Sequence, residues 1–240
     1  MAGRKKSKPP EPRFNRWVRK MRQGIRRWSL RLALFGFVFI AFATALFSVV
    51  NPVRTPYMLA EAWQSDGIEI DWVPIERIAP VMARSVVAAE DANFCAHWGF
   101  DMAAIRAAVE EGATRGASTL SQQTVKIVYL WQGRSWPRKA LEAVMTPLVE
   151  LVWSKRRIVE VYLNVAEFDE GVFGVGAAAG HYFGVSVGDL TATQSARLAA
   201  VLPDPKSRSA SQPSPFIERR AIAIADGAAT IQNDGRASCF

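Results

Sequence analysis

Two neighbouring acids, Glu90 and Asp91, are the residues of this sequence best suited to acid–base chemistry. They end an apolar stretch with helical spacing, and a turn containing Gly99 follows them. A carboxylate in that position is exposed in a cleft but only partly wet. Its pKa is then raised, and it can take a proton from a sugar hydroxyl. The acids therefore predict a catalytic base.

A group of cations downstream predicts an anion site. Arg138 and Glu142 stand four residues apart and Lys139 and Glu142 three apart, so one helix face carries all three. An ordinary solvated face with modest ion pairs has the same spacing. Lys126 and Arg134 beside it favour a binding site, because several fixed cations suit a multiply charged anion and arginine matches phosphate oxygens. The N-terminal region, described below, predicts an exported domain tethered to a membrane. In such a domain, a lipid diphosphate is the multiply charged anion that fits best.

Other reactive side chains give weaker signals. A further cationic patch occupies residues 155–157. His97 and His181 lack the spacing of metal ligands, and we expect His97 to form a hydrogen bond within its own turn. Ser118 has no histidine in a recognisable triad context, so it is interpreted as a helix-start and hydroxyl contact rather than a nucleophile.

The N-terminal region predicts a membrane anchor. Residues 1–31 hold 12 Lys/Arg and one acid, a net charge of +11, whereas the remainder of the chain nets −3. The basicity is therefore a tail and does not indicate nucleic-acid binding. Residues 32–50 are uncharged and would span about 28 Å as a helix, close to the hydrocarbon thickness of a bilayer. A cleaved signal peptide is the alternative, because residues 43–45 fit a cleavage pattern.

The rest of the chain predicts a short linker and one mostly α-helical domain. Residues 51–75 are expected to be loop-like with a strand near 68–73, and residues 76–235 to form the domain. Glycine and alanine over 171–180 indicate close backbone approach. The helices are expected over 76–90, 102–111, 119–130, 135–163 with a kink or break near Pro147, 192–202 and 216–233.

The two cysteines, Cys95 and Cys239, are expected to remain unpaired. Export would permit a disulfide. Cys239 stands next to the C-terminus, which we expect to be frayed, and Cys95 is interpreted as a small buried core residue.

Four ordered blocks resemble the signature of the peptidoglycan glycosyltransferases. The chain ends soon after them, so it resembles the monofunctional biosynthetic transglycosylases, without a transpeptidase domain. The resemblance implies a mainly α, lysozyme-like fold with a small lobe that touches the membrane. The blocks are Glu-Asp-x-x-Phe-x-x-His-x-Gly-Phe-Asp (90–101), Gly-x-Ser-Thr-x-x-Gln-Gln-x-x-Lys (116–126), Arg-Lys-x-x-Glu (138–142) and Lys-x-x-Ile-x-Glu-x-Tyr-Leu-Asn (155–164).

The same resemblance implies a role for each matching residue. Glu90 would deprotonate the 4-hydroxyl of an acceptor lipid II, which attacks the anomeric carbon of the growing glycan with inversion. Lys126 and Arg134 would contact the departing undecaprenyl diphosphate, with Glu142 as the second essential glutamate and Asp91 as a structural partner of the turn. The remaining implied substrate contacts are Ser118, Gln122, Gln123, Arg138, Lys139, Lys155 and Arg157.

The implied partners are lipid II, the nascent glycan chain and membrane lipid, with other cell-wall synthesis or division proteins as further candidates. The resemblance implies an inner-membrane protein with its N-terminus in the cytoplasm and its domain in the periplasm. No cofactor is required, and Mg²⁺ or Mn²⁺ would be held with the substrate diphosphate. A glycan-cleaving muramidase or lytic transglycosylase and a non-catalytic, membrane-tethered wall scaffold stay open as alternatives.

Overall fold

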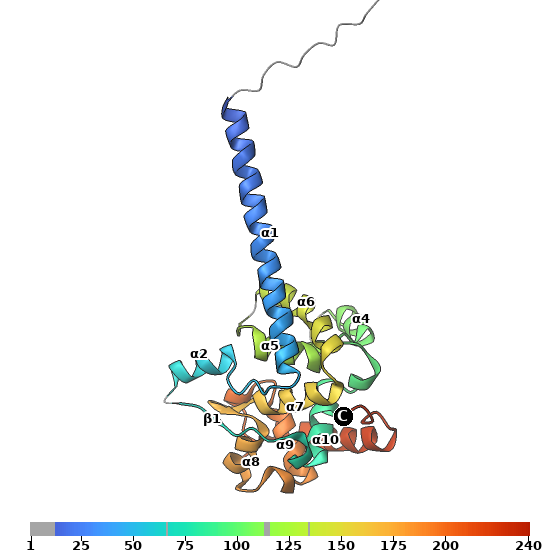
Figure 1. The fold of residues 1–240 in the computed structure, drawn as a ribbon. Helices are drawn as coiled ribbons and strands as arrows, with labels where there is room; N and C mark the ends of the chain where they lie inside the picture. Colours follow the sequence, from blue (N-terminus) through green and yellow to red (C-terminus); the bar gives the residue numbers. More distant parts are fainter. Residues whose placement is uncertain (1–12, 66, 113–115, 134) are drawn as a thin grey trace, which may run out of the picture. The chain divides into compact units, whose positions relative to one another are not determined.

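The computed structural model of the 240-residue chain describes residues 13–65, 67–112, 116–133 and 135–240 (Figure 1). The chain forms two units that divide between Leu46 and Phe47. Nearly all of helix α1 (Arg13–Phe47) belongs to the first unit. Within it, Arg19–Phe47 is long and apolar enough to cross a membrane. The helix ends three residues before the apolar segment 32–50 does.

The second unit is mainly α-helical, as the sequence predicts. One helix lies where only loop was expected, in residues 57–76. The predicted helix over 76–90 begins later, at Pro80, after a single 3₁₀ turn. The helices are α2 (Pro56–Gln64), α3 (Pro80–Glu90), α4 (Met102–Glu110), α5 (Leu120–Tyr129), α6 (Trp136–Val152), α7 (Lys155–Val165), α8 (Val175–Phe183), α9 (Ala192–Val201) and α10 (Pro215–Asn233). The 3₁₀ turns are Ile75–Arg77, Phe94–Ala96, Val187–Asp189 and Pro205–Ser207.

A small three-stranded sheet joins the linker to the domain. Its strands are β1 (Glu69–Ile70), β2 (Glu167–Asp169) and β3 (Val172–Phe173), in the order β1-β3-β2. β1 runs parallel to β3, and β2 runs antiparallel to it. Gly174 follows β3 with φ of 84°, and a Cβ there would lie 2.8 Å from the backbone oxygen of Asn164. The predicted close backbone approach in this segment is therefore confirmed.

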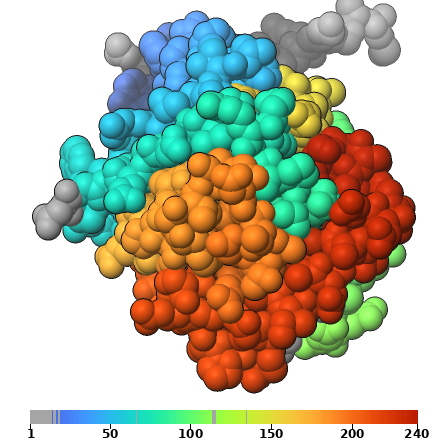
Figure 2. Space-filling view, turned by 90° about the horizontal axis from the view of Figure 1, so that it is seen from below, coloured from blue at the N-terminus to red at the C-terminus, as the bar shows by residue number. Residues whose placement is uncertain are grey.

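Two groups of helices build the interior of the second unit. In one, α3, α9 and α10 pack against each other through fully buried side chains such as Val86 and Leu198. In the other, α5 packs against α6 and α7, with Leu120 and Ile158 fully buried. Figure 2 shows the C-terminal residues, in red, beside the green-blue segment that includes α3.

Of the kink or break predicted near Pro147, the break is wrong. Helix α6 continues past this proline to Val152. A proline removes one backbone donor from a helix, and the packing of α6 on α5 outweighs that loss. The chain breaks instead at residues 153–154, where Ser154 accepts a hydrogen bond from the Arg157 amide and starts α7.

The predicted absence of a disulfide is also wrong. Cys95 and Cys239 are bonded, with their Cα atoms 5.7 Å apart. The C-terminal residues are not frayed, because they fold back onto the turn that follows α3. Arg236 donates to the backbone oxygen of Ala92 at 3.2 Å, and the ring of Phe240 packs against a ring in this turn. The last residues of the chain therefore hold the loop that follows Glu90.

Candidate active site

Glu90 is the last residue of α3 and lies in the wall of a cleft of about 240 Å³. The cleft is lined by residues 88–93, by Asp101 and Ala104, and by residues 116–119. The Glu90 side chain is 12% exposed. Burial raises its pKa, and the hydrogen bond from Gln123 is the largest opposing effect. A buried carboxylate that reaches a cleft has the properties of a general base.

A short hydrogen-bonded chain fixes one oxygen of this carboxylate. Gln123 of α5 donates from Nε2 to Glu90 Oε2 at 2.8 Å. The Tyr162 hydroxyl, on α7, donates in turn to Gln123 Oε1 at 3.1 Å. Burial keeps the pKa of Tyr162 well above its ordinary value, so this hydroxyl stays a neutral donor. Gln123, predicted as a substrate contact, thus orients Glu90 in the structure.

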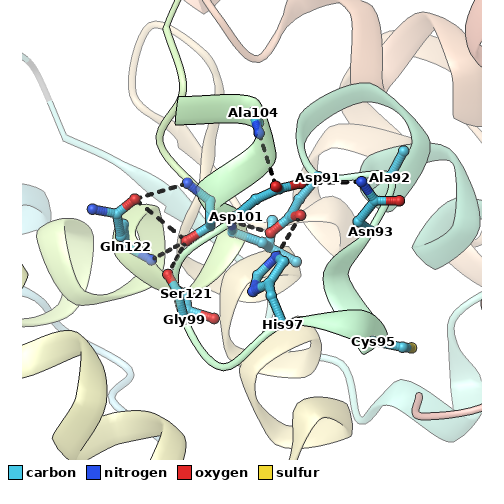
Figure 3. Close-up of polar contacts among 12 residues, drawn as sticks. Asp91, Ala92, Asn93, Cys95, His97, Gly99, Asp101, Ala104, Ser121 and Gln122 are labelled. Atoms are coloured by element: carbon cyan, nitrogen blue, oxygen red, sulfur yellow. Dashed lines mark hydrogen bonds and ion pairs between the residues drawn. The ribbon is translucent and has the colours of Figure 1, made fainter. Parts of the chain in front are cut away.

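Asp91 joins the end of α3 to the start of α5 (Figure 3). Its Oδ2 accepts from the Leu120 amide at 2.9 Å, and its Oδ1 is 2.8 Å from Nε2 of His97. Asp101 caps α4 by accepting from the Ala104 amide at 2.9 Å. The predicted roles of Asp91 and His97 within the turn and of Asp101 as a cap are confirmed. These bonds fix the turn after α3 and the starts of α4 and α5, which lie around the cleft.

Gln122 also has a structural place. Thr119 accepts from the Gln122 amide at 3.3 Å, and the Gln122 side-chain oxygen accepts from the Thr119 amide at 3.1 Å. This is the predicted capping box at the start of α5. The Thr119 hydroxyl donates to the backbone oxygen of Gly99 at 2.7 Å. Gln122 is buried, and its side-chain oxygen is engaged with the backbone.

The cations of α6 are organised around Glu142, which is buried. Glu142 accepts from Arg138 Nη1 at 3.0 Å and from Lys139 Nζ. Lys139 Nζ also donates to Ser118 Oγ at 2.9 Å, and Ser118 lines the Glu90 cleft. The face that Arg138 shares with Glu142 is buried, so it is not the ordinary solvated helix face that the spacing left open.

Lys126 of α5 interacts electrostatically with the acid and with these cations. Burial lowers its pKa, and the neighbouring Arg138 lowers it further, whereas Glu142 and Glu90 oppose the shift. Lys126 is therefore within electrostatic reach of both groups. It lines a second cleft of about 250 Å³ with Gln132 and residues of the 202–206 segment. Arg134, the other predicted diphosphate contact, lies outside the described residues.

Two of the cations predicted to contact the substrate form an ion pair or hydrogen bonds within the protein. Lys155 Nζ is 2.8 Å from Glu150 Oε1. Arg157 donates to the backbone oxygens of Phe47 and Val50 at 3.1 and 2.9 Å. These contacts hold the start of α7 to the rest of the unit, and they do not bring either cation to Glu90.

The comparisons with known proteins identify the family of this chain. The sequence matches the transglycosylase family over residues 58–228. This chain belongs to that family. It is 60% identical over 224 residues to the biosynthetic peptidoglycan transglycosylase of Jannaschia sp. (strain CCS1), covering 93% of each chain. It is 42% identical over 233 residues to the protein of that name from Caulobacter vibrioides, covering 94% of this chain and 99% of the relative. The Escherichia coli (strain ATCC 8739) protein is 47% identical over 209 residues, 82% and 86% of the two chains.

Sequence reasoning missed two residues at the site of this transglycosylase-family domain. Tyr162 stands inside the fourth block, but its spacing gave no hint of a link to Gln123. Arg220 of α10 has its Nη2 3.8 Å from Glu90 Oε1. Arg220 and Glu90 are far apart in the sequence, and no local pattern pairs them. The helical periodicity of α10 places Arg220 on a helix but not beside the acid.

Proposed function

We propose that this protein is a peptidoglycan glycosyltransferase that polymerises lipid II into glycan strands. The observation that carries the proposal is the placement of cations next to the Glu90 cleft: Lys139 bonds Ser118 in the wall of that cleft, and Lys126 is within electrostatic reach of Glu90 and of Arg138. A base on one side and fixed positive charge on the other suit the transfer of a sugar from a diphosphate. The printed names of the relatives support a peptidoglycan substrate.

Glu90 acts on the acceptor. Its carboxylate takes the proton from the 4-hydroxyl of lipid II, and that oxygen forms a bond to the anomeric carbon of the growing chain. The bond between this carbon and the diphosphate oxygen breaks, and undecaprenyl diphosphate leaves with the electron pair. Direct displacement from the opposite face inverts the anomeric centre from α to β.

The cation group acts on the leaving diphosphate. Fixed positive charges stabilise the negative charge that grows on the departing oxygen. Glu142 holds Arg138 and Lys139 in place, so the charges need little rearrangement during the reaction. Burial makes the charge of Lys126 unfavourable, which favours an anion beside it. Arg134 is proposed to join this group. A Mg²⁺ or Mn²⁺ ion would be held chiefly by the diphosphate, because Glu142 already accepts from two cationic side chains.

The apolar part of α1 is proposed to be a retained membrane anchor. Its length and composition are sufficient for one span. The basic segment before it favours a cytoplasmic N-terminus, which leaves the second unit in the periplasm. There it would meet a lipid-linked substrate and the nascent glycan chain at the membrane surface.

The direct test is incubation of the purified full-length protein in detergent with lipid II, followed by electrophoresis of the products. We expect glycan chains of many lengths and release of undecaprenyl diphosphate. A parallel incubation with polymeric cell wall should release no soluble fragments. Cleavage of the polymer without chain growth from lipid II would favour a glycan-cleaving enzyme and contradict the proposal. No reaction in either incubation would favour a scaffold.

A further inference from the structure

Two buried polar atoms at the proposed base lie near each other and have no hydrogen-bond partner among the residues that the structure describes. One is Oε1 of Glu90, and the other is Nε of Arg220. The closest approach of the two groups is 3.8 Å, from Arg220 Nη2 to Glu90 Oε1. Buried polar atoms of native proteins are nearly always bonded, so an unpartnered pair at a reaction centre calls for an explanation.

The fold fixes the position of Arg220. Helix α10 packs on both α3 and α9. A Cβ on Gly227 would lie 3.2 Å from Cβ of Ala88. Helices α10 and α3 therefore approach each other closely at a residue two positions before Glu90. The disulfide between Cys95 and Cys239 then closes the C-terminal end onto the loop after α3. The guanidinium is therefore held near the acid by packed backbone.

We propose that Arg220 is a positioning residue for Glu90. Its guanidinium keeps the carboxylate ionised and fixes the orientation of Oε1, while Gln123 holds Oε2. The inference rests on the proposed function. At 3.8 Å the guanidinium stabilises negative charge without a short donated bond to Oε1. A tight bidentate ion pair would hold the carboxylate charged more strongly and would make it a weaker base.

The other groups around Glu90 oppose or support this effect. The titratable groups that face it are Asp91 on its own turn, Lys126 of α5, Tyr162 of α7 and Arg220 of α10. Burial raises the pKa of Glu90 and Asp91 adds to the rise, whereas Gln123, Arg220 and Lys126 lower it in that order. Removal of Arg220 leaves burial less opposed. The base is then protonated at a higher pH.

The test compares full-length Arg220→Gln, Arg220→Lys and Arg219→Gln in lipid II polymerisation across pH. Arg219 is exposed on the same helix, so it is a matched control for the loss of one charge. For Arg220→Gln we expect the acidic limb of the activity–pH profile to move to higher pH. Activity on the acidic side of the profile should fall roughly tenfold and should recover at high pH. Arg220→Lys should stay near wild type and Arg219→Gln should match it.

A second measurement separates this inference from the proposed function. The Glu90 carboxyl band is followed by infrared pH titration, as a difference against Glu90→Gln, and needs no turnover. We expect its midpoint to be higher in Arg220→Gln than in wild type. An unchanged midpoint, an equal loss of activity at every pH, or a limb that moves as far for lysine as for glutamine would overturn the role of Arg220. A wild type that is inactive on lipid II would overturn the proposed function alone, because the titration still tests the contact.

Discussion

The acid and the cations of the candidate site are held by two differently built parts of the second unit. Glu90 ends α3, which is fixed by apolar packing against α9 and α10 and by a disulfide beyond the next turn. The cations are carried by α5 and α6, where the buried carboxylate of Glu142 holds Arg138 and Lys139. The base depends on packing and a covalent bond, and the anion site depends on ion pairs.

This difference suits the two tasks. A base needs its proton-accepting oxygen at a fixed place and needs a perturbed pKa, and a packed, dry wall provides both. A diphosphate site needs several positive charges close together, which repel one another until an anion or a carboxylate joins them. Perturbing each part should therefore give a different pattern of damage.

The largest expected effect on stability comes from the disulfide. The bond closes a loop of 144 residues, and loss of such a bond should lower the free energy of unfolding by about 4 kcal/mol. We expect the Cys95→Ser, Cys239→Ser double variant to melt well below wild type in calorimetry. Activity at low temperature should fall through looser placement of Glu90, with lipid II binding little changed.

Reductant provides the control for that variant. It should lower the melting temperature of wild type toward that of the double variant and leave the double variant unaffected. Equal melting temperatures for the oxidised wild type and the variant would show that apolar packing alone holds the base.

The next largest effect should follow from Glu142→Gln. This change should cost about 3 kcal/mol, because Arg138 loses its buried partner but keeps its hydrogen bond to the backbone oxygen of Gly133. In contrast to the disulfide variant, this change should weaken lipid II binding and turnover together. The check is KM and kcat beside a melting curve. Glu218→Gln, on a more exposed pair with Arg197, is a control that should change stability by no more than about 1 kcal/mol.

A smaller effect is expected for Tyr162→Phe. The change removes one hydrogen bond to Gln123 and should lower the free energy of unfolding by about 1 kcal/mol. Because Gln123 would then hold Glu90 Oε2 less firmly, kcat should fall several-fold while KM stays unchanged. A larger effect on KM than on kcat would place Tyr162 in substrate binding instead.

The local features of this fold could be predicted from the sequence, and the long-range ones could not. The caps at Asp101 and Thr119 were predictable because a side chain and a backbone amide three residues apart decide them. The disulfide was missed because pairing depends on where the C-terminal segment folds back. Helix α6 continues through Pro147 because its packing outweighs a local preference.

The site shows the same division. The sequence blocks identified Glu90, Lys126 and Glu142 as candidates, and the structure brings Lys126 within electrostatic reach of both glutamates. The blocks also assigned substrate contacts to Lys155 and Gln122, whose polar groups are engaged with Glu150 and with a helix cap. A motif shows which residues recur but not which atoms are already bonded. Arg220 lies outside every block and was found only through its distance to Glu90.

The most direct test of the central claim is the rate of lipid II polymerisation by Glu90→Gln, measured in the full-length protein beside its melting temperature. Glutamine keeps the shape and can still bond Gln123, but it cannot take a proton. We expect a loss of about 100-fold or more in rate with the fold intact. A folded variant that retains near-normal rates would contradict the assignment of Glu90 as the base and, with it, the account of the site.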